Sequence, residues 1–197
     1  MGDLIKSIYA GFMIGLGGTV YLSLENKIIG AILFSFGLLT IVNQGFYLYT
    51  GKVGYENSLS RLAIIILGNT IGTFIIAAMI CLSKPELVNV ANALWQNKYN
   101  LNSFQLIINS MLCGVMMYLA VDNYKRNNNI FFIIMPVVIF IISGFEHSIA
   151  NLFYMFLSKN VNIISISFII ICIVGNALGA KVFHSYKEIF CKTEIGE

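Results

Sequence analysis

The chain has 197 residues, of which 58% are hydrophobic and only 11% are charged, and its mean hydropathy is +0.82. A soluble domain of ordinary composition carries about 25% charged residues, so these residues could not cover a water-facing surface, and we expect a membrane protein in a lipid bilayer. The net charge of +3 is spread thinly, which excludes a nucleic-acid binder with a concentrated basic face, and the four cysteines show no spacing typical of a disulfide scaffold.

Six windows without Asp, Glu, Lys or Arg are long enough to cross a bilayer. A helix crosses the hydrocarbon layer of roughly 30 Å with about 20 residues. The sequence therefore predicts an all-α membrane protein with six transmembrane helices in a single domain, residues 1–197, joined by short loops. The longest of these loops is residues 84–98. The windows are 7–24, 28–51, 62–83, 99–121, 127–145 and 160–180, and the fifth span continues past Glu146 and His147 to Phe156.

The cations divide unequally between the two sides that alternating spans would create. Lysines and arginines are enriched on the cytoplasmic side of membrane proteins. The richer side also carries both termini, so we predict a multi-pass protein of the cell membrane with both termini in the cytoplasm. That side holds Lys6, Lys52, Arg61, Lys125, Arg126, Lys187 and Lys192, and the other side holds Lys27, Lys84, Lys98 and Lys159.

Two short elements recur in both halves of the chain. A Gly-Phe pair begins at Gly45 and again 99 residues later at Gly144, and a GN-x-x-G element begins at Gly68 and again 107 residues later at Gly175. Each half, about 1–83 and 99–187, then holds three spans. Since three is odd, the second half enters the membrane from the opposite side, which predicts an inverted 3+3 repeat. Such folds place their transport path near the midplane, between interrupted helices.

The second and fifth spans each contain residues that interrupt a helix. The second span carries the polar run 43–45, and the fifth carries Pro136 followed by Ser143-Gly144. An amide in hydrocarbon needs a hydrogen-bond partner. We therefore expect Asn69 and Asn176, which occupy matched positions of the repeat, to tie down the interrupted parts of these two spans.

Glu146 and His147 are the only ionisable residues deep inside a predicted span. A charge there is costly, and such residues mark functional sites. Neighbours on a helix diverge by about 100°, so we expect His147 to face the path. Glu146 is then expected to pack, accepting hydrogen bonds from backbone groups freed by the break in the second span. A histidine titrates near pH 6.5 and could assist the protonation of a small weak-acid anion, which crosses a dry constriction more cheaply as the neutral acid.

Two segments of the sequence resemble the formate/nitrite transporter family. Residues 144–153, GFEHSIANLF, are very close to that family's GFEHSIANMF signature, and residues 45–51 resemble its G-A-[DE]-L-F-T loop. The resemblance extends from about residue 4 to 187. It implies an aquaporin-like protomer with helices 2 and 5 interrupted, a homopentamer with a pore in each protomer, and conduction of small monovalent anions.

The resemblance also implies roles for particular residues. His147 matches the pore histidine and Thr50 the hydroxyl that hydrogen-bonds it. Asn151 follows the histidine as in the family, and Lys98 matches a basic residue that raises the local anion concentration. One constriction would be formed by Leu38, Leu48 and Tyr49, which replaces a phenylalanine and adds a hydroxyl, and the other by Phe34 and Phe140. The departures from the family pattern are Tyr47 in place of an acidic residue and Gly114 and Met117 in place of Asn and Val.

Three functions are consistent with these features. The leading one is a channel or transporter for small monovalent weak-acid anions such as formate, nitrite or hydrosulfide, with His147 assisting protonation. The alternative is an aquaporin-like channel for a small neutral solute, in which His147 only donates hydrogen bonds, and the third is a non-conducting sensor or scaffold. No metal-ligand spacing, phosphate-binding loop or nucleophile triad is present in the sequence, so we expect no metal, no cofactor and no enzyme activity.

Overall fold

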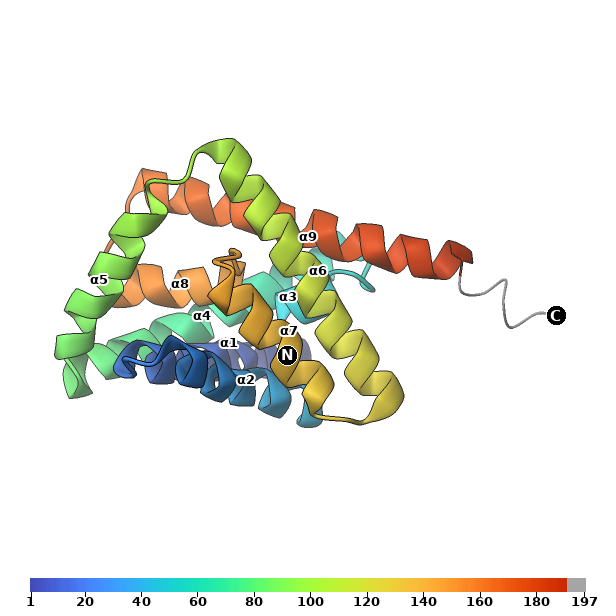
Figure 1. Cartoon of the computed structure of the whole chain (residues 1–197), viewed down its shortest axis with the longest axis horizontal. Coiled ribbons are helices and arrows are strands. Elements are labelled where there is room, and N and C mark those ends of the chain that lie inside the picture. The colour runs from blue at the N-terminus through green and yellow to red at the C-terminus, as the bar shows by residue number, and fades with distance from the viewer. Residues whose placement is uncertain (191–197) are drawn as a thin grey trace.

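The structure is a computed structural model that describes residues 1–190, so Cys191 and Lys192 lie outside the described residues. Within them the chain is helical and contains no strand (Figure 1). The helices are α1 (Gly2–Ser23), α2 (Lys27–Asn43), α3 (Tyr49–Lys52), α4 (Leu59–Ser83), α5 (Glu86–Lys98), α6 (Ser103–Asn127), α7 (Phe131–Ile142), α8 (Ser148–Leu157) and α9 (Ile163–Phe190).

Four of the described helices, α1, α4, α6 and α9, are long and apolar enough to cross a membrane. The segments expected as the second and fifth spans are each divided, the second into α2 and α3 and the fifth into α7 and α8. Many large apolar side chains on these helices remain exposed, among them Phe36, Leu67 and Phe74. An exposed apolar surface of this extent is expected for a protein whose solvent is a bilayer.

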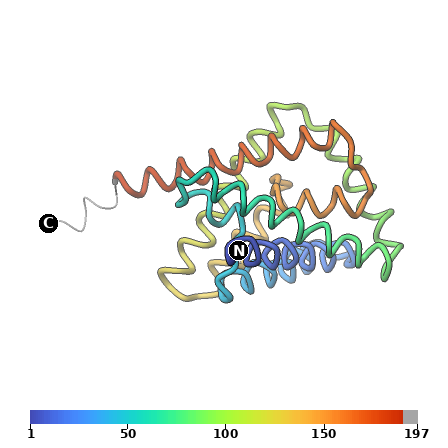
Figure 2. Tube along the Cα trace, turned by 180° about the vertical axis from the view of Figure 1, so that it is seen from behind, coloured from blue at the N-terminus to red at the C-terminus, as the bar shows by residue number. Residues whose placement is uncertain are grey.

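The two halves repeat the same helix contacts. Helix α1 packs along α4 and against α2, just as α6 packs along α9 and against α7, and α1 and α4 run side by side in Figure 2. Glycines allow these close approaches. A Cβ added to Gly72 would overlap the carbonyl oxygen of Ile8, and one added to Gly179 would overlap that of Met111.

Both breaks have the same backbone geometry. Gly45 has a φ of +66° and Gly144 a φ of +70°, a left-handed conformation that glycine adopts without steric cost. The next residue then closes each break, since the Phe46 and Phe145 N–H groups donate to the carbonyls of Ile41 and Phe140, both at 2.9 Å. The two Gly-Phe pairs of this chain thus form the same turn, once in each half.

The segment 84–98, expected as a loop, is largely helix α5. Pro85 precedes its first turn, where a missing N–H costs nothing. Leu87, Ala91 and Trp95, each four residues after the previous one, form its buried face. Trp95 is fully buried and donates to Ser165 Oγ at 3.3 Å. The polar outer face of α5 gives the segment a low hydropathy, which is why a search for apolar windows did not find it.

Candidate functional site

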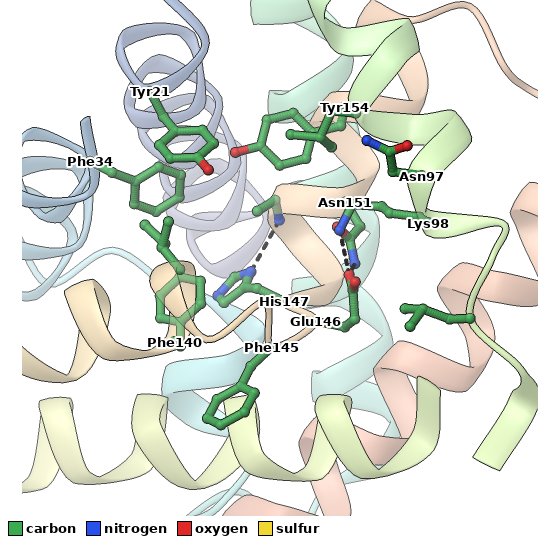
Figure 3. A pocket seen from close by; sticks show the side chains of 15 residues that line it. Tyr21, Phe34, Asn97, Lys98, Phe140, Phe145, Glu146, His147, Asn151 and Tyr154 are labelled. Carbon is green, nitrogen blue, oxygen red and sulfur yellow. Dashed lines mark hydrogen bonds and ion pairs between the residues drawn. The ribbon is translucent and has the colours of Figure 1, made fainter. Parts of the chain in front are cut away.

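Each of the two helix breaks lines a cavity. The larger, of about 290 Å³, is lined by residues of α1, α2, α5, α7, α8 and the 143–147 break (Figure 3). The smaller, of about 90 Å³, is lined by residues of α2, the 44–48 break, α3 and α6. The expected constriction residues divide between them: Phe34 and Phe140 line the larger cavity, and Leu38 and Leu48 line the smaller.

His147 is the residue immediately before α8 and is 2% exposed. Its Nδ1 accepts a hydrogen bond from the Ala150 N–H at 3.0 Å, and its Nε2 lies 2.9 Å from Thr50 Oγ1. A backbone N–H can only donate, so Nδ1 carries no proton and the neutral ring has its proton on Nε2. The Nε2–H therefore donates to Thr50. This leaves the hydrogen of the Thr50 hydroxyl for another acceptor.

Glu146 also lines the larger cavity, in contrast to the expectation that it only packs. Its Oε2 accepts from Lys98 Nζ at 2.6 Å and from Asn151 Nδ2 at 2.8 Å (Figure 3). The expected partners, backbone groups freed by the break in the second span, are not the ones found. The helical rule that separates neighbours by about 100° does not apply, because residues 145–147 are not helical.

Asn69 and Asn176 make equivalent hydrogen bonds in the two halves. The Oδ1 of Asn69 accepts from the Tyr49 N–H and that of Asn176 from the Ser148 N–H, both at 2.9 Å. The amide of Asn69 donates to the carbonyls of Ser7 and Tyr47, both at 2.8 Å. That of Asn176 donates to the carbonyls of Ser110 and Glu146, at 2.8 and 2.9 Å. Each amide thus joins the first helix of its half to the end of the connection at which α3 or α8 begins.

The aromatic side chains beside His147 form an apolar wall. Phe34 and Phe140 meet edge to face with ring centres 6.1 Å apart, and the Phe140 ring stacks on that of His147 at 5.6 Å. Tyr49, expected to add a hydroxyl to a constriction, lines neither cavity, and its hydroxyl donates to the Ile173 carbonyl of α9 at 3.0 Å. The Tyr49 hydroxyl therefore fastens α3 to α9.

Gly114 and Met117, two departures from the family pattern, both lie in the packed interior. A Cβ added to Gly114 would overlap the Asn176 carbonyl, so an asparagine could not occupy position 114 in this packing. Met117 is buried at 1% exposure.

Lys98 is expected to attract anions, but its ammonium forms an ion pair with Glu146. The charge of Lys98 is therefore compensated locally.

Some lining residues were not anticipated from the sequence. Tyr21 and Tyr154 line the larger cavity, and Lys52 and Lys125 line the smaller one. The lysines had been counted only as charges of the loops, since nothing in their spacing shows that α3 and α6 bring them to one cavity.

Comparison with known proteins agrees with this geometry. The family model described as formate/nitrite transporter matches residues 2–188. The formate channel FocA of Haemophilus influenzae is 29% identical over 150 residues, which cover 64% of this chain and 52% of that protein. The formate channel FocB of Escherichia coli is 24% identical over 181 residues, 76% of this chain and 64% of that protein. The chain thus spans about half the length of FocA.

Solved structures share the fold. A pentameric formate channel with formate bound superposes with a TM-score of 0.87 at 21% identity, over 98% of this chain and 97% of that chain. An FNT family ion channel superposes with a TM-score of 0.76 at 22% identity, over 96% of this chain and 88% of that chain. The similarity covers all the helices that carry the two cavities.

Proposed function

The chain belongs to the formate/nitrite transporter family, and from that membership we propose that it passes small monovalent weak-acid anions, such as formate, nitrite or hydrosulfide, across the cell membrane. One observation carries the proposal: His147 of one helix break is hydrogen-bonded to Thr50 of the other. His147 lines the larger cavity, and Thr50 lies between Leu48 and Gly51, which line the smaller. The hydrogen bond therefore joins the walls of the two cavities.

The energetics favour passage as the neutral acid. Moving a carboxylate into a low-dielectric region costs several kcal/mol even after relaxation, whereas protonating an acid of pKa about 3.9 at pH 7 costs about 4 kcal/mol. At the apolar wall of Phe34 and Phe140 the anion meets the hydroxyl of Thr50, whose hydrogen is left for it because the Nε2–H of His147 donates to the Thr50 oxygen. The hydroxyl holds the anion where its affinity for a proton is raised by the low dielectric, and His147 assists protonation by orienting that hydroxyl.

The neutral form of His147 is central to this mechanism. An imidazolium would carry a proton on Nδ1, which would then face the Ala150 N–H that it now accepts from. The loss of that cap opposes charging of the ring, so the proton reaches the anion from the water of a cavity. Asn151 and Lys98 hold Glu146 at the wall of the larger cavity and so keep its charge from repelling the anion.

The same repeat supports an architecture for the whole protein. In it α1, α2–α3 and α4 form three spans and α6, α7–α8 and α9 form three more, in two inverted halves of one domain. The matched roles of Asn69 and Asn176 support this symmetry. The relative titled a pentameric formate channel supports a homopentamer, and the distribution of lysine and arginine supports cytoplasmic termini.

The test is uptake of labelled formate into proteoliposomes as the external pH is lowered from about 7.5 to about 6, a range in which the proton supply rises more than tenfold. We expect uptake to rise with falling pH and to be lost in His147→Phe. Uptake of water or glycerol with a flat pH profile would instead support a neutral-solute channel. No flux of any solute, with the protein folded, would support a sensor or scaffold.

A further inference from the structure

The hydrogen bonds of the two asparagines set the register between the halves. Asn69 binds the N–H of Tyr49 and Asn176 binds that of Ser148, so a residue of the first break corresponds to the residue 99 positions later. By this register Tyr47 corresponds to Glu146, and Lys52 corresponds to Asn151. The two breaks therefore have the same backbone but different charges.

At the larger cavity the charges are compensated. Glu146 is 3% exposed and binds the ammonium of Lys98 at 2.6 Å and the amide of Asn151 at 2.8 Å. At the smaller cavity the corresponding carboxylate is missing. The ring of Tyr47 instead lies among three cations, with Lys52 Nζ at 4.5 Å, Lys6 Nζ at 5.1 Å and Arg61 Cζ at 5.3 Å from its centre.

Three carboxylates at this end of the described chain, those of Asp3, Glu56 and Asp122, are engaged by other cations. Arg61 binds Asp3 at 2.8 Å and Glu56 at 3.0 Å. Asp122 accepts from Lys187 at 2.7 Å and from Arg126 at 3.1 Å. Among the described residues no carboxylate lies within 4.0 Å of the ammonium of Lys52 or Lys125.

Lys52 and Lys125 both line the smaller cavity, and the rest of its lining is apolar side chains and glycine. Its volume of about 90 Å³ suits an anion of a few heavy atoms. We propose that this cavity is a binding site for a small monovalent anion held by Lys52 and Lys125, so that the two ends of the path have unequal anion affinities.

The cation–π contact of Lys52 with Tyr47 does not prevent this role. Such contacts at partly exposed sites are weak compared with a charge-assisted hydrogen bond to an anion. Lys125 is likewise held over an aromatic ring, that of Tyr55, at 4.7 Å. The two rings thus contact both ammonium groups without neutralising them, in contrast to Glu146, which neutralises Lys98.

Binding can be tested without any transport. Thermal unfolding of the purified protein in detergent is followed with increasing sodium formate, and with sodium gluconate, too large for the cavity, at the same ionic strength. A ligand that binds only the folded state raises the unfolding temperature. We expect formate to raise it in the wild type and in Lys52→Arg, and the effect to be lost in Lys52→Gln and halved or more in Lys125→Gln. Lys84→Gln, which removes an exposed lysine elsewhere, is the matched control and should respond as the wild type.

Equal stabilisation by gluconate, or full stabilisation by formate in Lys52→Gln, would overturn the site.

The transport consequence rests on the proposed function and has its own assay. This assay measures the half-saturation concentration for formate from each side of oriented proteoliposomes. A protease-removable tag at Met1 reports the orientation. We expect Lys52→Gln to change the ratio of the two half-saturation concentrations at least fivefold, and an unchanged ratio would contradict the asymmetry. Absence of formate flux in the wild type would defeat the proposed function but leave the thermal assay to decide the binding site.

Discussion

Thr50 and His147 form the polar pair on which the proposed transport mechanism depends, and they come from different halves of the chain. In Thr50→Val the Nε2–H of His147 loses its acceptor and a passing anion loses the hydroxyl that donates to it. Leaving a buried donor unsatisfied costs about 1–3 kcal/mol, and about 1.4 kcal/mol on a barrier is tenfold in rate. We expect formate flux to fall by roughly tenfold, measured by uptake into proteoliposomes.

The matched control for this prediction is Thr50→Ser, which retains the hydroxyl and removes only a methyl group. It should keep most of the flux. If Thr50→Val transported formate at the wild-type rate while remaining folded, the proposed role of the Thr50 hydroxyl would be wrong.

The ion pair between Lys98 and Glu146 is a second feature that can be tested at single residues. In Glu146→Gln the ammonium of Lys98, whose side chain is 16% exposed, loses its counter-charge. Breaking a buried pair from one side costs about 3–5 kcal/mol, and the partial exposure of Lys98 reduces this to about 2 kcal/mol. We expect a lower unfolding temperature for Glu146→Gln, followed by thermal unfolding in detergent.

The double variant Lys98→Met with Glu146→Gln should recover part of this loss, because no uncompensated charge then remains near the cavity. Losses that simply add in the double variant would show that the two groups do not interact in the folded protein.

At the scale of helices, close packing through glycine distinguishes the α1–α4 and α6–α9 pairs. A Cβ on Gly72 or Gly179 would meet a backbone carbonyl oxygen, of Ile8 or Met111, and a backbone atom cannot move aside as a side chain can. Because the two sites are equivalent, we expect Gly72→Ala and Gly179→Ala to lower the unfolding temperature to similar degrees. Gly2→Ala, where an added Cβ meets nothing within 4 Å, is the control, and an equal effect there would contradict the packing argument.

These helix pairs also show how far the sequence could predict the structure. The polar run 43–45 and Pro136 with Ser143-Gly144 predicted the divided helices. The repeated GN-x-x-G and Gly-Phe elements predicted two matched halves, because they encode backbone requirements, a close approach and a left-handed turn, that few other residues satisfy. The contact between Thr50 and His147 was available through the family resemblance. The helix α5 was missed because its stability comes from the burial of Trp95 against α9, and the partner of Glu146 was missed with it, since Lys98 is the last residue of that helix.

At the scale of the whole molecule, the fold brings together charged residues whose proximity the sequence could not predict. Lys52 and Lys125 are far apart in the chain and were counted only toward the orientation of the loops, yet the fold places both at one cavity. Neither lysine forms an ion pair with Asp3, Glu56 or Asp122, because Arg61 and Lys187 pair with these carboxylates instead. Such pairings arise from tertiary packing, to which no spacing along the chain is a guide.

The orientation of the molecule determines which side of the membrane these charges face. If the spans alternate as proposed, the turn after α6 at Asn128 faces the cytoplasm together with Lys6, Lys52 and Lys125. The turn after α8 at Asn160 then faces the outside. The positive-inside rule thus predicts opposite labelling of two engineered cysteines, Asn128→Cys and Asn160→Cys, in a background without the natural cysteines.

The measurement is reaction with a membrane-impermeant maleimide in intact cells and in inverted membrane vesicles. Asn160→Cys should react in cells, and Asn128→Cys only in inverted vesicles. Since α7 and α8 together account for one crossing between these two turns, labelling of both from the same side would contradict the six-span arrangement. The reverse pattern would preserve the spans but place the smaller cavity, and with it the lysine site, on the outer face of the membrane.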